Sequence, residues 1–371
     1  MNDRDSKKAA ELLHLRGQRL AKGDPIALPL TLASMYHLPG DPAGHPGYGR
    51  SDNPTWETAE HAISHLEGAP ALLFPSGMGA ISAVFLALLK AGDRVLLPSD
   101  GYYATRVFAE RFLKGLGIGI DTRPTRHFEI GGFEGYRMVF VETPSNPGLE
   151  TCDLARVAAS VRAAGGISVV DNTTMTPFGQ RPLDLGADIV VAADTKAPGG
   201  HSDLLSGHVA SKDDLTLNAL RDWRRLSGAI PGPFEAWLLH RSLETLEMRF
   251  DRMCTTAGIL AERLADHGAV AGLRYPGLVA DPAYAVAARQ MARFGFLIGV
   301  TLKSETAAER FIDGCPLLRP ATSFGGVHSS AERRARWGDA VDPGFVRLSV
   351  GCEPLDELWR AIDMALRAAA G

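Results

Sequence analysis

Residues 169–203 read VVDNTTMTPFGQRPLDLGADIVVAADTKAPGGHSD, and this stretch decides the fold. It holds two apolar runs of the kind that fill buried strands in a parallel sheet. Asp171 closes the first run, and Lys196 follows the second run directly before a glycine-rich turn. Ligands of open α/β sheets gather outside the carboxyl ends of the strands, so we expect both side chains to face one site.

An amine and a carboxylate at one site favour a particular chemistry. Lys196 can form a Schiff base with a carbonyl group, and Asp171 can hold a protonated ring nitrogen, so the pair suits a pyridinium cofactor. Each residue alone has an ordinary explanation, since most lysines are solvated and an Asp after a strand commonly caps the next helix. The cofactor hypothesis therefore depends on the other segments of the chain.

Apolar runs and helical stretches alternate along the first two thirds of the chain. The runs ALLFP, RVLLP, MVFVE, ISVVD and DIVVAAD are separated by stretches such as GAISAVFLALLKAG and DLARVAASVRAAG. This alternation predicts an α/β fold with a mostly parallel sheet covered by helices. After Pro231, a long helical stretch, the strand-like run FGFLIGVTL and a final helical stretch predict a smaller α+β domain.

The predicted organisation has three parts. Residues 1–46 are rich in Pro and Gly after a short helical start, and we interpret them as an N-terminal arm. Residues 47–230 form the predicted large, cofactor-binding domain, and residues 231–371 form the small C-terminal domain. A chain of 371 residues is long enough for two domains.

The composition favours small-molecule chemistry. The net charge is only −4 and no Lys/Arg run is sustained, so we expect neither nucleic acid nor a membrane as a partner. The four cysteines lack C-x-x-C spacing, which argues against a disulfide framework and a zinc site, and we expect no metal. The N-terminus lacks an apolar export signal, and no apolar stretch reaches the ~20 residues that span a bilayer. These features predict a cytoplasmic protein.

Ser76, Gly77 and Met78 mark a candidate anion site. They follow the run ALLFP and open the helical stretch AISAVFLALLK. Backbone N–H groups at a helix N-terminus can bind an anion, and a phosphate group would fit there. The ordinary alternative is a helix start that Ser76 merely caps.

Several segments resemble the fold-type I pyridoxal 5'-phosphate (PLP) enzymes of cysteine and methionine metabolism, the family of cystathionine γ-lyase and cystathionine γ-synthase. The resemblance runs from about Tyr48 to the C-terminus, and the order of the segments matches that of the family. The segments are YGRSDNPTWE, FPSGMGAI, SDGYYATR, ETPSNPGLE, VVDNTTMTPFGQRPLDLGADIV, DTKAPGGHSD, RSLETLEMR, TSFGGVHSS and RLSVGCEP.

The resemblance implies roles for the residues around the cofactor. Lys196 is similar to the Schiff-base lysine that later acts as a base, and Asp171 to the partner of the ring nitrogen. Asn146 resembles the ligand of the phenolic oxygen, and Tyr102 the tyrosine that stacks on the ring and protonates the leaving group. The implied phosphate ligands are Gly77, Met78 and Thr195, joined by Tyr48 and Arg50 from a neighbouring subunit.

The resemblance also implies a substrate pocket and an assembly. Arg347 is similar to the arginine that binds the substrate α-carboxylate, although an arginine in this position also suits a surface ion pair. Ser323 lines the same pocket in the family, and His328 stands where most cystathionine-using relatives have a glutamate. Because Tyr48 and Arg50 reach a neighbouring subunit in the family, we expect a homodimer at least, and family precedent suggests a homotetramer.

The chain departs from the family pattern at several positions. Ala193 replaces a serine that binds the phosphate, so one hydrogen bond of roughly 1.5–3 kcal/mol is lost or supplied by water. Tyr103 replaces a common glycine, so either tyrosine could stack on the ring, and the spacing favours Tyr102. His328 replaces an anion with an imidazole, which should change the distal groups that the pocket accepts.

The expected activity is γ-elimination on cystathionine or a similar γ-substituted amino acid, giving cysteine, 2-oxobutanoate and ammonia. The alternatives are γ-replacement on an activated homoserine and β-elimination. Ala104 replaces a cysteine usual in methionine γ-lyases, and Phe324 keeps β-elimination open. A PLP-binding or metabolite-binding protein without turnover is the alternative from another class. A nucleotide-binding protein is disfavoured because no GxGxxG follows the first strand.

Overall fold

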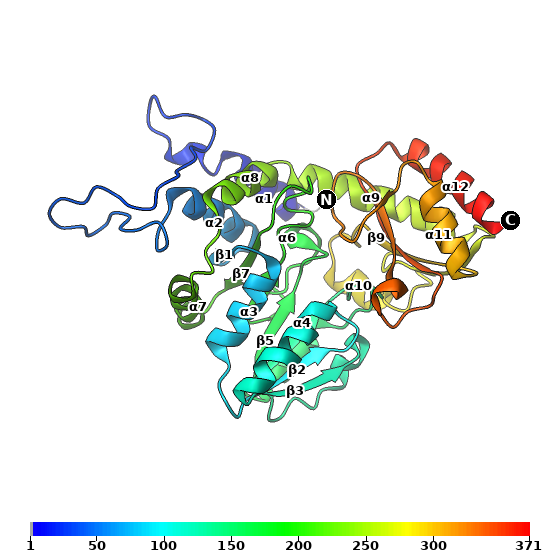
Figure 1. Ribbon diagram of the computed structural model, residues 1–371, viewed down its shortest axis with the longest axis horizontal. Helices are drawn as coiled ribbons and strands as arrows, with labels where there is room; N and C mark the ends of the chain where they lie inside the picture. Colours follow the sequence, from blue (N-terminus) through cyan, green and yellow to red (C-terminus); the bar gives the residue numbers. More distant parts are fainter. Residues whose placement is uncertain (1–2) are drawn as a thin grey trace.

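The computed structural model describes residues 3–371 and contains two β-sheets with helices packed on them (Figure 1). The larger sheet has seven strands in the order β1-β7-β6-β5-β4-β2-β3. All its strand pairs are parallel except the two that β7 makes with β1 and β6, so the predicted mostly parallel sheet is confirmed. The strands are β1 (Ala71–Phe74), β2 (Arg94–Pro98), β3 (Gly119–Arg123), β4 (Met138–Glu142), β5 (Ile167–Asp171), β6 (Ile189–Ala192) and β7 (Gly207–Ser211).

Side chains of the central strands alternate between the two faces of this sheet. Val95 and Leu97 of β2 join one hydrophobic cluster, whereas Leu96 between them joins another. β4, β5 and β6 divide their side chains in the same way. Successive side chains of a strand point to opposite faces, and both faces are buried here, which explains why the runs are apolar at nearly every position.

Helices cover both faces of the large sheet. α3 (Gly77–Leu88) and α7 (Asp214–Ser227) pack on one face. α2 (Pro54–Glu67), α5 (Leu154–Ala163) and α8 (Pro233–Leu243) pack on the other. The shorter helical segments are η1 (Gly17–Arg19), α4 (Tyr103–Phe108), η2 (Ala109–Leu113), η3 (Lys114–Leu116), η4 (Thr125–Ile130) and α6 (Thr176–Gly179).

The carboxyl ends of six strands lie at one edge of the large sheet, since β3 also pairs in parallel with β2. β2, β4, β5 and β6 are joined by parallel pairing, and β1 runs in the same direction because both β1 and β6 are antiparallel to β7. The loops that follow these strands therefore meet, as expected for the ligand-binding edge of an open α/β sheet.

The second sheet belongs to a smaller α+β unit, as predicted. It has five strands in the order β10-β11-β12-β9-β8, and all but the β10–β11 pair are antiparallel. In Figure 1 the long helix α9 leads from the large sheet to this unit. Its elements are α9 (Leu246–Ala265), β8 (Val270–Arg274), α10 (Tyr284–Gln290), β9 (Leu297–Leu302), α11 (Glu305–Gly314), β10 (Arg319–Pro320), β11 (Ser330–Arg333), η5 (Arg334–Trp337), β12 (Phe345–Ser349) and α12 (Leu355–Ala370).

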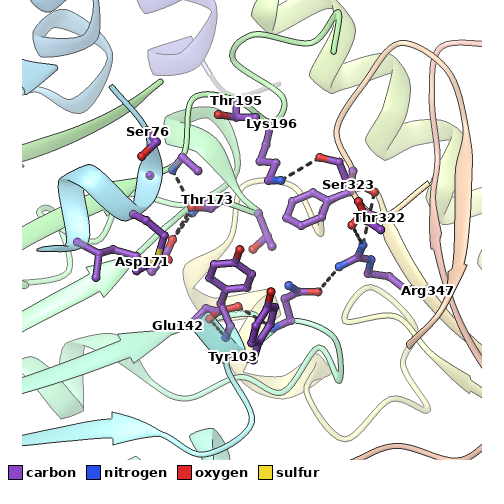
Figure 2. A pocket seen from close by; sticks show the side chains of 18 of the residues that line it. Ser76, Tyr103, Glu142, Asp171, Thr173, Thr195, Lys196, Thr322, Ser323 and Arg347 are labelled. Atoms are coloured by element: carbon purple, nitrogen blue, oxygen red, sulfur yellow. Dashed lines mark hydrogen bonds between the residues drawn. The ribbon is translucent and has the colours of Figure 1, made fainter. Parts of the chain in front are cut away.

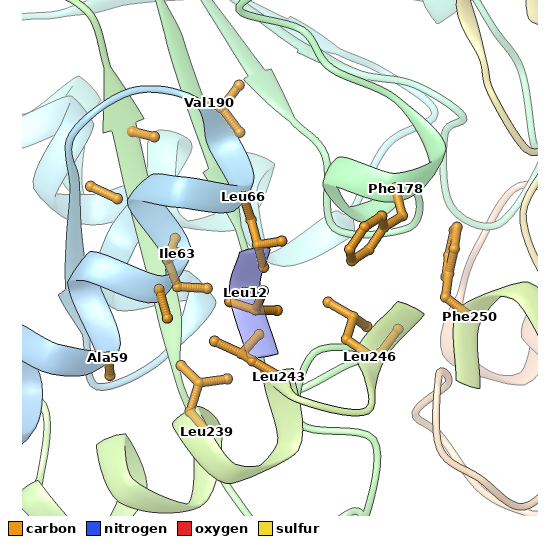
Figure 3. Close-up of a cluster of buried hydrophobic side chains, with 14 of the residues drawn as sticks. Leu12, Ala59, Ile63, Leu66, Phe178, Val190, Leu239, Leu243, Leu246 and Phe250 are labelled. Atoms are coloured by element: carbon orange, nitrogen blue, oxygen red, sulfur yellow. The ribbon is translucent and has the colours of Figure 1, made fainter. Parts of the chain in front are cut away.

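The predicted domain boundary at residue 230 stays a prediction. α8 lies just beyond it, yet its buried residues Ala236, Leu239 and Leu243 join the same hydrophobic cluster as α2 (Figure 3). The smaller unit has a separate cluster, built from α9, α11, α12 and the second sheet. α8 therefore packs with α2 on the large sheet, although the prediction assigned residues 231–371 to the small domain.

Residues 3–50 divide into a docked helix and a projecting loop. Among them, α1 (Asp3–His14) packs against α2. Leu12 of α1 is buried among the apolar side chains of α2 and α8 in Figure 3, and Lys8 Nζ donates to the carbonyl oxygens of His65 and Leu66. The following chain extends away from the body as the blue loop in Figure 1 and exposes Ile26 and Met35. The predicted arm is therefore extended only after α1.

Residues 3–371 lack both a membrane-spanning helix and a cluster of metal ligands. No helix in this range combines the length and apolar character needed to cross a bilayer. In the same part of the chain, no group of three or more His, Cys, Asp or Glu side chains is arranged to hold a metal ion. All four cysteines are unpaired thiols.

Replacing Phe250 with Ala should destabilise the contact between the two units. Phe250 on α9 is fully buried, meets Phe296 edge to face at 5.9 Å between ring centroids, and lies near Phe178 in Figure 3. Deleting such a ring costs about 3–5 kcal/mol of unfolding free energy. Urea unfolding should show this loss, whereas Leu215→Ala, at a position 79% exposed on α7, should change it by less than about 0.5 kcal/mol. Equal losses in the two variants would contradict the assigned core.

Candidate active site

A cavity of about 510 Å³ opens at the carboxyl edge of the large sheet (Figure 2). Its volume lies in the range of small-molecule sites. The loops after β1, β2, β4, β5 and β6 line one side, and Ser323 and Arg347 of the smaller unit line the other. The predicted residues that line it are Ser76, Gly77, Met78, Tyr102, Asn146, Asp171, Thr195, Lys196, Ser323 and Arg347.

Lys196 projects into the middle of the cavity (Figure 2). Its Nζ donates to Ser323 Oγ at 2.9 Å and lies 4.9 Å from the centroid of the Phe324 ring. Burial, and after it the charge of Arg347, lowers the pKa of the Lys196 amine from 10.5 to about 8. The amine is therefore much more often neutral, and hence nucleophilic, than a lysine in water.

Asp171 ends β5 with a buried carboxylate at the cavity wall. The backbone N–H and the hydroxyl of Thr173 donate to its Oδ1 at 3.0 and 2.5 Å. Burial raises the pKa of Asp171, while the hydrogen bonds from Thr173 and the charges of His208 and Lys196 oppose that rise. The two donors of Thr173 are neutral, so they favour the ionised form of the carboxylate without adding a counter-charge.

The turn before α3 presents backbone without side chains to the cavity. Ser76 caps the helix by accepting from Gly79 N at 3.0 Å, which confirms the ordinary capping role. A Cβ atom at Gly77 would lie 2.5 Å from the Cβ atom of Ala193, so the close approach of β6 requires glycine here. The first N–H groups of a helix have no partner within the helix, and Gly77 and Met78, the first two residues of α3, line the cavity.

Tyr102 and Tyr103 both line the cavity, and their rings meet edge to face at 5.3 Å. Tyr102 is the more buried of the two, since Tyr103 is 48% exposed. Burial, and after it Tyr103, raises the pKa of the Tyr102 phenol, and Arg334 opposes the rise. Tyr102 therefore keeps its proton at neutral pH and can donate it.

Asn146 and Arg347 connect the two sides of the cavity. Arg347 Nη1 donates to Asn146 Oδ1 at 2.6 Å, and Nη2 donates to the Thr322 carbonyl oxygen at 2.7 Å. The Arg347 guanidinium is almost fully buried and lies 5.0 Å from the centroid of the Phe324 ring. A guanidinium fixed in this way suits a carboxylate ligand.

Three predicted site residues lie outside this cavity. Arg50 Nη1 donates to the Arg225 carbonyl oxygen at 2.6 Å, its guanidinium stacks 5.6 Å from the Tyr48 ring, and Tyr48 is 50% exposed. His328 is exposed and lines a neighbouring cavity, which shares Lys196 and Ser323 with the first. The roles of Tyr48, Arg50 and His328 stay predictions.

Sequence reasoning missed the carboxylate that supports the cavity from behind Tyr102. Glu142 ends β4, and its two oxygens accept from the backbone N–H groups of Tyr102 at 2.5 Å and Asn146 at 2.7 Å. Burial, and after it Asp171, raises its pKa well above the ordinary value. Its position at the end of an apolar run, as for Asp171, was the signal that could have found it.

A buried ion network below the lysine was also missed. His208 on β7 donates to Asp194 Oδ1 at 2.8 Å and to Glu67 Oε1 at 3.2 Å. Burial alone would lower the pKa of His208, but Asp194 and Glu67 raise it to about 10, so the ring is a cation. Asp194 is two residues before Lys196, and the network therefore fixes the start of the turn that carries the lysine.

The residues of the cavity fit a phosphorylated pyridine aldehyde. The glycine turn at the α3 N-terminus offers N–H groups to a phosphate, Asp171 offers a charge to a protonated ring nitrogen, and Lys196 offers a buried amine to the aldehyde. Asn146 uses its oxygen on Arg347, which leaves its N–H₂ group as a donor for a ring oxygen. These four kinds of group are arranged along one cavity.

We expect the Lys196 amine to titrate near pH 8 in the protein freed of bound aldehydes, because burial disfavours its charged form. The rate of its reaction with a simple aldehyde should rise up to about pH 8 and then level off, and Lys196→Met should abolish this phase. Between about pH 8 and 10.5 the unfolded chain binds more protons at this amine than the folded chain, so stability should rise with pH there. A rate that keeps rising to pH 10.5 would contradict the assigned burial.

Comparison with known proteins places this geometry in a family. The family model described as Cys/Met metabolism PLP-dependent enzyme matches residues 11–367. A Streptomyces coelicolor protein, provisionally named cystathionine gamma-lyase, is 49% identical over 353 residues, which cover 92% of this chain and 90% of the relative. The L-methionine gamma-lyase of Pseudomonas putida is 38% identical over 353 residues, with 89% and 87% covered.

A solved structure agrees with these matches. The cystathionine gamma synthase from Xanthomonas oryzae pv. oryzae, in complex with cystathionine, superposes with a TM-score of 0.93 at 31% identity, and the match covers 98% of both chains. The fold-type I architecture and the dependence on PLP that the sequence predicts are confirmed. The chain belongs to the family of PLP-dependent enzymes of cysteine and methionine metabolism.

Proposed function

We propose that the protein catalyses γ-elimination on a γ-substituted amino acid, with cystathionine as its substrate and cysteine, 2-oxobutanoate and ammonia as products. One observation carries the proposal: a largely buried amine, a buried carboxylate and a buried guanidinium line the same cavity. Lys196, Asp171 and Arg347 supply these groups. The S. coelicolor relative, which carries the name of this activity, supports the choice of cystathionine.

The cofactor is held, in this proposal, by groups from both ends of the cavity. The backbone at Gly77 and Met78, with Ser76 and Thr195, binds the phosphate, and Asp171 pairs with the ring nitrogen. Asn146 donates its amide N–H to the phenolic oxygen, and Tyr102 stacks on the ring. When bound, PLP supplies an aldehyde that reacts with amines and a protonated ring that withdraws electrons from the substrate Cα.

Two side chains move the protons. Lys196, once its amine is free, takes the proton from the substrate Cα, and its lowered pKa of about 8 makes it a base that is available near neutral pH. Loss of a second proton, from Cβ, then lets the sulfur leave Cγ. Tyr102 has a raised pKa, so its hydroxyl carries a proton that it can give to the departing sulfur. The hydrogen bond from Lys196 Nζ to Ser323 Oγ holds the amine on the cavity side.

Arg347 orients the substrate by binding its α-carboxylate. The bidentate geometry of a guanidinium fixes the carboxylate in a plane, which in turn directs the Cα–H bond toward the base. γ-Replacement on an activated homoserine is a second candidate, because the chain matches a γ-synthase over 98% of both lengths at a TM-score of 0.93. Release of keto acid without an added thiol separates elimination from replacement.

The active assembly is, in this proposal, a homodimer that pairs into a tetramer in the cytoplasm. The loop that carries Tyr48 and Arg50 projects from the body, and it exposes Ile26, Leu32 and Met35 to solvent by 88%, 75% and 79%. Exposed apolar side chains on a projecting loop favour packing against a second copy. Tyr48 and Arg50 would then complete the phosphate site of that copy.

Lys196→Ala should abolish the cofactor's lysine-linked absorption band and strongly reduce the turnover of cystathionine. The wild type should show the band and release 2-oxobutanoate, while the variant should lose activity by about 10²-fold to 10⁴-fold because its base is missing. Spectra and a keto-acid assay measure both effects. Lys114→Ala, at a side chain 69% exposed, is the matched control and should behave as the wild type. A wild type with the band that leaves cystathionine unchanged would exclude this substrate.

Mixing two impaired variants should restore activity if neighbouring subunits share each site. Arg50→Gln should weaken the phosphate site, and Lys196→Ala should remove the base. In random mixed dimers, half of the molecules are hybrids with one site intact, so co-expression should restore about a quarter of the wild-type activity. If the activity is no greater than the sum of the two separate variants, Arg50 acts in the site that contains Lys196 of the same subunit, or in no site.

A further inference from the structure

Glu332 on β11 lies directly across from Arg347 on β12 in the register of the second sheet. Its Oε2 accepts from Arg347 Nη2 at 2.9 Å and also from Arg334 Nη1 at 2.8 Å. Its Oε1 accepts from Trp337 Nε1 at 2.6 Å. The Glu332 side chain is 1% exposed, so a single buried carboxylate accepts hydrogen bonds from two guanidinium groups and one indole. The Arg336 guanidinium also lies 3.6 Å from its Oε1.

The three side chains that donate hydrogen bonds to Glu332 line the cavity, whereas Glu332 itself stands behind them. Arg334, Trp337 and Arg347 are wall residues of the 510 Å³ cavity, and Glu332 is not among those that line it. Arg334 is held from its other side by Asp339, whose Oδ2 accepts from Arg334 Nε at 2.7 Å. The carboxylate therefore acts on a ligand only through the side chains that it holds.

The charges of this cluster explain why the contact matters. Arg347 and Arg334 share one oxygen atom of Glu332, so without that carboxylate two buried cations would face each other with Asp339 as their remaining counter-ion. Burial and the charge of Arg334 lower the pKa of Arg347 to about 10, and Glu332 opposes this effect. Removing one partner of a buried ion pair leaves the other uncompensated and free to turn away.

Arg347 is oriented from two directions. Its Nη1 contacts Asn146 of the large sheet's loops, and its Nη2 contacts Glu332 and the Thr322 carbonyl oxygen of the smaller unit. The contact with Glu332 sets the plane of the guanidinium relative to β12. A carboxylate clamp depends on that plane because both of its hydrogen bonds lie in it.

We infer that Glu332 is a positioning residue for the recognition of the substrate α-carboxylate: it fixes the plane of Arg347 and ties it to the Arg334–Trp337 segment of the cavity wall. The inference rests on the proposed function, in which Arg347 binds that carboxylate. It also limits the ligand class, because amino acids with a free α-carboxylate should depend on Glu332 and their amides should not.

The test uses two ligands that differ at the carboxylate alone. L-norleucine and L-norleucinamide have no group to eliminate, so their binding can be followed by spectral titration of the holoenzyme without turnover. The wild type should bind norleucine more tightly. Glu332→Gln keeps the shape of the side chain but replaces one acceptor with an N–H₂ donor. Its dissociation constant for norleucine should rise about tenfold or more, while that for norleucinamide should change by less than about twofold.

Glu309→Gln is the matched control. Glu309 on α11 accepts from Nε of Arg333, the neighbour of Glu332 on β11, at 2.5 Å, and Arg333 is not a wall residue of the cavity. This variant should keep the wild-type preference for norleucine. If Glu332→Gln does not fold, Glu332→Asp, which keeps the charge but shortens the side chain, should show the same selective loss.

The outcomes separate this inference from the proposed function. A wild type without any preference for norleucine would remove Arg347 as the carboxylate ligand, and both proposals would fall. A wild-type preference that survives in Glu332→Gln or Glu332→Asp would overturn the role of Glu332 alone. Equal weakening of both ligands would also overturn it, because a general loss of structure does not distinguish a carboxylate from an amide.

Discussion

The site depends on keeping one amine out of water. A lysine in water holds its proton at neutral pH and is a poor nucleophile. Lys196 is buried by groups from both units, since it follows β6 of the large sheet while Ser323 and Phe324 of the smaller unit contact its Nζ. The packing of the two units therefore sets the pKa of about 8 that makes the amine reactive.

Buried charge elsewhere in the site is compensated by neighbours fixed on the scaffold. Asp171 takes two hydrogen bonds from Thr173, and Thr173 Oγ1 in turn accepts from Ala193 N at 2.9 Å, on the strand end that leads to Lys196. The Glu67, His208 and Asp194 network contributes a cation below that turn. A charge in the interior is tolerated only when partners surround it, so the positions of Asp171 and Lys196 depend on each other through these contacts.

Sequence reasoning found the residues whose placement follows from a rule along the chain. Apolar runs predicted the parallel strands. Because Asp171 and Lys196 each follow such a run, the sequence also predicted that their side chains would lie at the same edge of the sheet. It missed Glu332 because the partner of that carboxylate lies fifteen residues away, and only the register of β11 with β12 places it opposite Arg347. The docking of α1 against α2 was also missed, because a short amphipathic segment does not show which surface it covers.

The polarity of the Asn146 amide connects substrate recognition to the cofactor. Its oxygen accepts from Arg347, so its nitrogen is the atom that remains to donate to the phenolic oxygen of PLP. A carboxylate at this position would hold Arg347 but repel a phenolate, and an apolar side chain would release both. In the proposed function, a single amide thus relates the ring to the guanidinium that would bind the substrate carboxylate. Breaking the substrate Cα–H bond depends on the angle between that bond and the cofactor ring. The position of Arg347 relative to the ring would therefore affect the rate of the reaction.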